Sequence, residues 1–183
     1  MCGIVGVLHL EEGAVTPEFL HRMVAAVAHR GPDGQGVQML QAGSRHVGLG
    51  HARLKVIDLS AAADQPTASD DGAVWLVFNG EVYNFRELRQ MLTARGAVFR
   101  TASDTEVILR LYEAEGDRCI EQLDGMFVLA VWDGRQQRLL LARDRTGKKP
   151  LFYFSSPRLF AFASEVKALL CHPAIATVLF FWY

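Results

Sequence analysis

The amino-terminal stretch constrains the fold most, because an apolar run directly follows the second residue. Ile4, Val5 and Val7 are apolar and β-branched, which favours a buried strand with Cys2 at its tip. After loss of Met1, this cysteine would carry both a thiol and a free α-amine, whose ordinary pKa of about 7.7–8.0 leaves part of it neutral near pH 7. Such an amine can accept the thiol proton, as the amine of an N-terminal threonine accepts its hydroxyl proton.

Position 2 also has a simpler interpretation. Met1 is retained and the thiol of Cys2 packs as a small hydrophobic group. Taken alone, the position favours this interpretation. The motifs elsewhere in the chain shift the balance toward a reactive cysteine.

Length, charge and cysteine content narrow the class of protein. The 183 residues are enough for one ordinary domain with a core, and the net charge of −1 gives no reason to expect a nucleic-acid or membrane surface. Cys2, Cys119 and Cys171 are odd in number and widely spaced, which predicts neither a disulfide framework nor a metal site. We expect a cytoplasmic protein without signal peptide or membrane span.

Apolar spacing predicts helices over residues 17–28, 85–95 and 104–115, and a short one from Ser164. Thr16 followed by Pro17 is typical of a helix start. Asn84 and Ser103 each precede a Glu by three residues, which is the spacing of a capping box.

Strands are predicted over residues 37–40, 46–49, 51–58, 73–78, 126–132, 138–143, 151–154 and 159–163. The strand 73–78 is expected to end at Asn79-Gly80. This dipeptide favours a hairpin turn, but the helix expected four residues later weakens that interpretation. Residues 30–36 are expected to form a loop. Together the elements predict an α+β fold with antiparallel sheets.

The end of the chain differs from the rest. Residues 1–170 are predicted to form one domain, and residues 171–183 an apolar tail. Its last six residues, Val178–Tyr183, are all apolar. They fit a buried strand, an interface, the start of a further domain or a truncation scar.

Seven motifs occur in the order found in class II glutamine amidotransferases: Cys2 to Gly6, Arg30 to Gly34, His51 to Leu54, Gln65-Pro66, Phe78 to Asn84, Ser103 to Glu106 and Asp144 to Leu151. Within that family the chain most resembles the glutaminase domain of glutamine-hydrolysing asparagine synthetase. The resemblance extends from Cys2 to about Leu170. It implies the N-terminal nucleophile hydrolase fold, a four-layer αββα sandwich with two antiparallel sheets.

The resemblance also implies the catalytic residues. Cys2 would attack the side-chain amide of glutamine and form a thioester, with release of ammonia. Asn79, through its side-chain N–H, and Gly80, through its backbone N–H, would stabilise the oxyanion. One such donor contributes roughly 10²–10³ in rate.

Glutamine is a zwitterion, so its site needs a cation and an anion. Arg53 resembles the arginine that binds the carboxylate in the family, and its planar fork suits that role. Asp104 would accept from the α-ammonium, although an acid at a helix start is also favoured by the helix dipole. By family position, Glu81 and the backbone of Leu54 and Ile57 would contact the substrate.

The chain carries neither a Ser-Gly-Gly-x-Asp-Ser loop nor a Gly-x-x-x-x-Gly-Lys loop, so we expect it to bind no cofactor. ATP and magnesium are implied only for a synthetase domain or subunit outside this chain, which would use the ammonia to make asparagine from aspartate. The expected partners are L-glutamine, that synthetase component and, as one arrangement, a second copy in a homodimer.

Two other functions remain alternatives. The first is a non-catalytic glutamine-binding or interaction domain, in which Met1 stays on and blocks the amine. The second is an N-terminal-cysteine amidase that acts on another amide.

Overall fold

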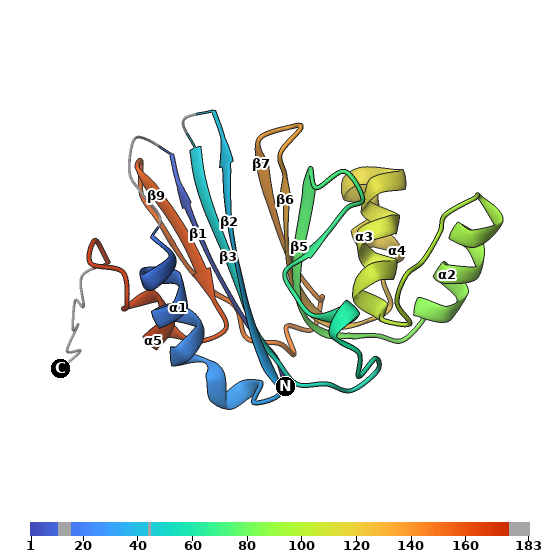
Figure 1. The fold of residues 1–183 in the computed structure, drawn as a ribbon, viewed down its shortest axis with the longest axis horizontal. Coiled ribbons are helices and arrows are strands. Elements are labelled where there is room, and N and C mark those ends of the chain that lie inside the picture. The colour runs from blue at the N-terminus through green and yellow to red at the C-terminus, as the bar shows by residue number, and fades with distance from the viewer. Residues whose placement is uncertain (11–15, 44, 176–183) are drawn as a thin grey trace.

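The computed structural model describes residues 1–10, 16–43 and 45–175, in which the chain forms two facing antiparallel sheets (Figure 1). The first sheet has the order β2-β3-β1-β9-β8, with β1 Gly3–His9, β2 Gly34–Ala42, β3 Arg45–Arg53, β8 Phe152–Ser155 and β9 Leu159–Ala163. The second has the order β4-β5-β6-β7, with β4 Thr67–Ala68, β5 Val74–Val82, β6 Gly125–Asp133 and β7 Arg138–Arg143.

Helices cover the outer face of each sheet (Figure 1). On the first sheet lie α1 Pro17–Ala26 and α5 Val166–Leu169. On the second lie α2 Phe85–Ala94, α3 Asp104–Glu115 and α4 Cys119–Gln122. Three short 3₁₀ turns complete the regular structure: η1 Ala28–Arg30, η2 Ala61–Ala63 and η3 Gly116–Arg118.

The first strand shows how sequence alternation builds these layers. Val5 and Val7 pack toward α1, whereas Ile4 and Leu8 fill the space between the sheets. Adjacent side chains of a strand point to opposite faces, so both faces of β1 are buried. Gly6 leaves the space that the ring of Phe162 occupies, since a Cβ there would lie 2.2 Å from it.

The second sheet is built in the same way. Val128, Ala130 and Trp132 of β6 face the first sheet, whereas Leu129 and Val131 face the helices α2 and α3. Three apolar layers therefore separate helix, sheet, sheet and helix. The predicted αββα sandwich of class α+β is confirmed.

Beyond Arg53, the predicted strand 51–58 is wrong. β3 ends at Arg53, and the chain then turns into a loop that reaches η2. The Arg53 guanidinium donates to the backbone carbonyls of Asp58 and Ser60, which curls the loop around this side chain. A local alternation of apolar and polar residues could not reveal bonds to residues five and seven positions ahead.

The predicted strand end at Asn79-Gly80 is also wrong. β5 continues through both residues to Val82, because Gly80 pairs with Phe127 and Val82 pairs with Gly125 of β6. The hairpin interpretation fails for the same reason. The two residues therefore lie in a strand, and not in a turn.

The predicted helix starts have different outcomes. Thr16 caps α1 as expected, because its side chain accepts from the backbone N–H of Phe19. Ser103 caps α3 by accepting from Glu106 N, but the Glu106 carboxylate binds Thr101 N instead of closing the box.

The capping box predicted at Asn84 is wrong. Asn84 precedes α2, but its side chain makes no cap hydrogen bond to that helix. It donates to Gln122 O and accepts from Asp124 N, and so ties the helix start to the segment before β6.

Residues 176–183, which include most of the predicted apolar tail, lie outside the described residues. Cys171 and Ile175 pack against the cluster around α1, beyond the predicted boundary at residue 170, which stays a prediction. Within the described ranges, the helices are too short or too polar to cross a bilayer.

Candidate active site

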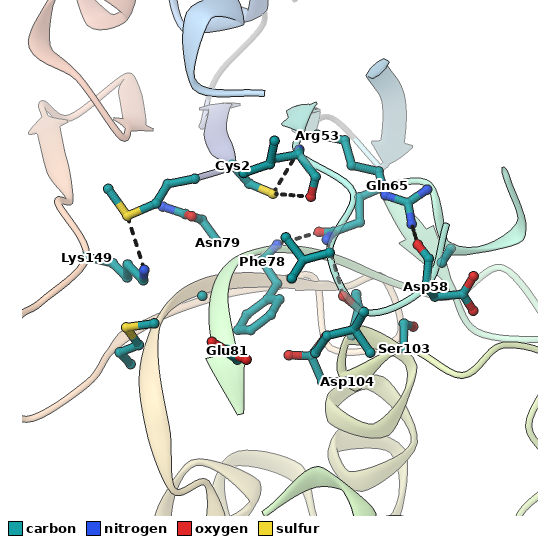
Figure 2. A pocket seen from close by; sticks show the side chains of 18 residues that line it. Cys2, Arg53, Asp58, Gln65, Phe78, Asn79, Glu81, Ser103, Asp104 and Lys149 are labelled. Carbon is teal, nitrogen blue, oxygen red and sulfur yellow. Dashed lines mark hydrogen bonds between the residues drawn. The ribbon is translucent and has the colours of Figure 1, made fainter. Parts of the chain in front are cut away.

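Cys2 sits directly before β1, beside the end of β3 (Figure 2). Its sulfur accepts from the backbone N–H of Leu54 at 3.3 Å and lies 3.6 Å from the carbonyl oxygen of the same residue. The Cys2 carbonyl accepts from Arg30 Nε at 3.0 Å, and Arg30 is held in turn by Glu165 at 3.1 Å. The candidate nucleophile is therefore anchored through both its side chain and its backbone.

Burial raises the pKa of the Cys2 thiol above its ordinary value. The Leu54 hydrogen bond, the positive chain terminus and Arg53 act in the opposite direction without overcoming burial, and Asp104 adds to the rise. The thiol is therefore protonated near neutral pH and needs a base to become a nucleophile. Met1 precedes Cys2 in the structure, so the nitrogen of Cys2 is part of a peptide bond there.

A cavity of about 170 Å³ extends from Cys2 between the sheets and the start of α3. All eight site residues predicted from the sequence line it: Cys2, Arg53, Leu54, Ile57, Asn79, Gly80, Glu81 and Asp104. The structure thus brings together residues that lie up to 102 positions apart in the chain. Their individual roles stay predictions.

Asn79 offers an unused hydrogen-bond donor to this cavity. The residue is only 1% exposed, and its side-chain nitrogen has no acceptor among the described residues. A buried N–H without an acceptor costs free energy, typically about 1–3 kcal/mol. This donor is therefore free for an oxygen that enters the cavity.

Gly80 is required for steric reasons. A Cβ at this position would lie 2.3 Å from the carbonyl oxygen of Met126 and 2.7 Å from the Cα of Phe127. Both atoms belong to the backbone of β6, so they cannot move aside as a flexible side chain would. Only glycine allows β5 and β6 to approach this closely beside Asn79.

The backbone N–H and C=O of Phe78, the residue directly before Asn79, are each held by a side chain. Gln65 Oε1 accepts from Phe78 N at 2.6 Å, and His51 Nε2 lies 3.1 Å from Phe78 O. Burial lowers the pKa of His51 to about 4, so the ring is neutral near pH 7 and donates to this carbonyl. Gln65 also donates to Thr105 at 3.2 Å, which links β5 to α3.

Arg53 is buried, and its guanidinium organises the loop after β3. It donates to the carbonyls of Asp58 and Ser60 and forms an ion pair with the carboxylate of Asp64. A guanidinium has five N–H donors, so these three bonds leave two for a ligand. Leu54 and Ile57 of the same loop line the cavity, but the Leu54 N–H already points to the sulfur of Cys2.

Asp104 and Glu81 supply negative charge to the cavity, and Figure 2 shows Glu81 between Lys149 and Asp104 in that view. Asp104 is the first residue of α3 and accepts from Val82 N at 3.2 Å. Burial, with a smaller contribution from the nearby Glu81, raises the pKa of Asp104 to about 6, although backbone N–H groups act in the opposite direction. A bound ammonium group would offset this cost of burying the carboxylate.

Among the cavity residues to which the sequence assigned no site role are Gln65, Lys149 and Asp58. Gln65 and Lys149 lie within motifs, but nothing local to them indicates the cavity. Asp58 accepts from Ser60 N and Ala102 N, and these bonds hold the loop after β3 against the residues before α3. Hydrogen bonding to Ser60 and Ala102 lowers the pKa of Asp58 to about 2.

Comparison with known proteins adds the following similarities. The sequence model of the family described as "Glutamine amidotransferase domain" matches residues 1–179. The chain is 40% identical over 177 residues to asparagine synthetase [glutamine-hydrolyzing] 3 of Bacillus subtilis (strain 168). This alignment covers 96% of this chain and 28% of that protein. The chain is also 40% identical over 186 residues to a probable asparagine synthetase [glutamine-hydrolyzing] of Schizosaccharomyces pombe. This alignment covers 99% of this chain and 32% of that protein.

Among solved structures, the fold is similar to that of a glutamine phosphoribosylpyrophosphate amidotransferase from B. subtilis, solved with ADP and GMP. The TM-score is 0.75 at 22% identity, over 93% of this chain and 43% of that one. This similarity confirms the N-terminal nucleophile hydrolase fold. The chain spans only about a third or less of the length of the two asparagine synthetases given above.

Proposed function

The chain belongs to the family of glutamine amidotransferase domains, and on that premise we propose that it hydrolyses L-glutamine to glutamate and ammonia through Cys2. One observation carries the proposal. The thiol of Cys2 and the unpaired side-chain N–H of Asn79 line the same cavity. A nucleophile next to a free oxyanion donor is what acyl transfer requires.

The proposed reaction begins after Met1 is removed, because only then does Cys2 have a free amine. The amine accepts the thiol proton, and the sulfur attacks the side-chain carbonyl carbon of glutamine. The carbonyl oxygen becomes an oxyanion that accepts from Asn79 and from the backbone N–H of Gly80. The proton then passes to the departing nitrogen, ammonia leaves, and water hydrolyses the thioester to glutamate.

The opposite end of the cavity fits the amino-acid part of the substrate. Asp104 and Glu81 pair with the α-ammonium, and the two remaining N–H groups of Arg53 donate to the α-carboxylate. Charged pairs of this kind are shorter and stronger than neutral hydrogen bonds. The distance between the two ends then selects an amide on a side chain of fixed length.

The test is glutamine hydrolysis by the purified chain together with its intact mass. We expect a species without Met1 that releases ammonia and gains mass at Cys2 with an electrophilic glutamine analogue. Cys2→Ala should abolish ammonia release and still bind glutamine, and Cys171→Ala, outside the cavity, should retain activity. A chain that keeps Met1, binds glutamine and resists labelling would instead be a glutamine-binding domain.

We further infer that the ammonia serves asparagine synthesis from aspartate, because the two relatives given above are named as glutamine-hydrolysing asparagine synthetases. An ATP-dependent synthetase domain or subunit would then be the partner. The test mixes this chain with the synthetase region of the B. subtilis relative, ATP, magnesium, aspartate and glutamine labelled with ¹⁵N in the amide. Labelled asparagine supports this inference, and labelled ammonia alone contradicts it.

The proposed compartment is the cytoplasm. Cys2, Cys119 and Cys171 are all free thiols in the structure. A reducing compartment keeps such thiols reduced, which a thiol nucleophile requires.

A further inference from the structure

Lys149 lies on the loop before β8 and lines the same cavity as Cys2 and Asn79. It is only 5% exposed, and its Nζ is 3.1 Å from the thioether sulfur of Met1. Among the described residues, it has no carboxylate within 4.0 Å. Figure 2 shows Lys149 on the side of Asn79, away from Arg53.

This contact depends on a residue that the proposed chemistry removes. A thioether is a weak acceptor, and a buried ammonium group is costly without a strong partner. Loss of Met1 therefore leaves the Lys149 ammonium facing the space next to the new amino terminus. Five covalent bonds join the Met1 sulfur to the Cys2 nitrogen and span at most about 6 Å, so Nζ lies within about 9 Å of that nitrogen.

We propose that Lys149 is a positioning residue that keeps the α-amine of Cys2 unprotonated near neutral pH, so that the amine can accept the thiol proton. The proposal rests on the proposed function. A positive charge disfavours a second positive charge nearby, and at this separation it lowers the pKa of an amine by about one unit.

Two other cations, Arg30 and Arg53, also lie near Cys2. Arg30 donates to the Cys2 carbonyl and Arg53 lies at the end of β3, but each is paired with a carboxylate, Glu165 and Asp64 respectively. Pairing therefore offsets part of their charge, although Arg53 still acts to lower the pKa of the Cys2 thiol.

The charged side chains on the cavity wall have opposite effects on the protonation of the Cys2 amine. Glu81 of β5, Asp104 of α3 and Asp58 of the loop after β3 favour a protonated amine, and Lys149 counters them. Lys149 contacts Met1, the residue bonded to Cys2, whereas among the described residues the carboxylates of Glu81, Asp104 and Asp58 make no hydrogen bond to Met1 or Cys2. Lys149 is thus the cation that the geometry assigns to the amine.

The test measures the amine directly. The protein contains three cysteines, and after Met1 removal only Cys2 carries an α-amine, so ¹⁵N-cysteine labelling gives one terminal amine signal whose pH titration is read by NMR. Intact mass first establishes that Met1 is absent. We expect Lys149→Met to raise the pKa of the amine by about one unit relative to the unsubstituted protein.

Two variants serve as controls. Lys149→Arg keeps the charge and should keep the low pKa. Lys148→Met makes the same charge change at the exposed neighbouring residue and should leave the pKa unchanged. If Lys149→Met fails to fold, Lys149→Gln supplies the neutral side chain.

Activity gives the second readout. In Lys149→Met, the acid limb of kcat/KM against pH should move to higher pH by the same amount, with KM for glutamine unchanged at high pH. An amine pKa that does not shift in Lys149→Met would overturn the proposal. A raised KM for glutamine with an unmoved acid limb would also overturn it, because Lys149 would then be a substrate ligand. The NMR titration needs no turnover, so it judges Lys149 even if glutamine hydrolysis itself is absent.

Discussion

The two ends of the cavity are built differently. At the reacting end, Cys2 precedes a central strand of one sheet and Asn79 lies within a strand of the other, so both backbones are held by neighbouring strands. At the binding end, Arg53 lies at a strand end, and the loop of residues 54–60 is wrapped around its guanidinium. Sheet hydrogen bonds hold the groups proposed to make and break bonds, whereas side-chain bonds hold the groups proposed to recognise the substrate.

This difference has a functional meaning. Groups in the middle of a sheet move little, as preorganised catalysis requires. A loop held by one side chain can adapt to a ligand at lower cost. Substitutions at the reacting end should therefore lower kcat, and those at the binding end should raise KM.

Apart from Cys2→Ala, which removes the nucleophile, the largest effect is expected for Asn79→Ala. It removes the free donor of the reacting end, so kcat should fall by about 10²–10³ while KM changes little. Steady-state kinetics of glutamine hydrolysis measure both constants. A variant that raises KM and keeps kcat would mean that Asn79 belongs to the binding end.

Asp104→Asn should come next, with KM for glutamine raised about 10–100-fold and kcat largely retained, because a charged hydrogen bond to the substrate is lost. Asp124→Asn is the matched control, since it changes the same charge outside this cavity. Equal effects of the two variants would exclude a specific role for Asp104.

The same substitution should stabilise the free protein. The pKa of Asp104 is raised to about 6, so between its ordinary value and pH 6 the folded state binds more protons and stability falls as pH rises. Removing the charge should therefore raise the free energy of unfolding at pH 7 by about 1–3 kcal/mol. Urea denaturation measures it, and a less stable variant would contradict this interpretation.

Acidification provides a smaller test of the binding end. Below pH 6 Asp104 takes up a proton and no longer attracts the substrate ammonium, so KM at pH 5 should be about tenfold above its value at pH 7. In Asp104→Asn this dependence should disappear. A pH-dependent KM that persists in the variant would assign the titration to another group.

The smallest effect is expected for Gln65→Met, which keeps the shape but loses the bond to the backbone N–H of Phe78. Asn79 should then be less well positioned, and kcat should fall about 3–10-fold. The same substitution in Asn79→Ala should have no further effect, because the donor to be positioned is already absent. Additive losses would mean that Gln65 acts elsewhere.

The sequence predicts the elements better than the path of the chain at the site. Thr16 marks the first helix, and the apolar runs mark the buried strands, because these signals are local. The loop after Arg53 was predicted to be a strand, since no local pattern reveals that a guanidinium binds carbonyls farther along. Asn79-Gly80 has the composition of a turn, yet pairing with β6 extends the strand through it.

Seven of the eight site residues could be named from the sequence because they lie in motifs shared with a family, and Ile57 because it follows one of these motifs at the position the family uses. The sequence pattern alone could not show that these residues meet in one cavity, because this depends on the pairing of strands far apart in the chain. Lys149 shows the limit most clearly. It lies in one of the motifs, but its approach to the amino terminus spans 148 positions and leaves no signal in the residues around it.

The anchoring of the first strand has a consequence for biosynthesis. The backbone N–H of Ile4 donates to the hydroxyl of Ser164, and the backbone N–H of Ser164 donates to the carbonyl of Ile4. On one side β1 pairs with β9. At about 5–20 residues per second, the ribosome needs ~10–30 s between these two segments. The amino terminus thus emerges first and stays unpaired until β9 is made, so the proposed removal of Met1 has time to take place before β1 is fixed in the sheet.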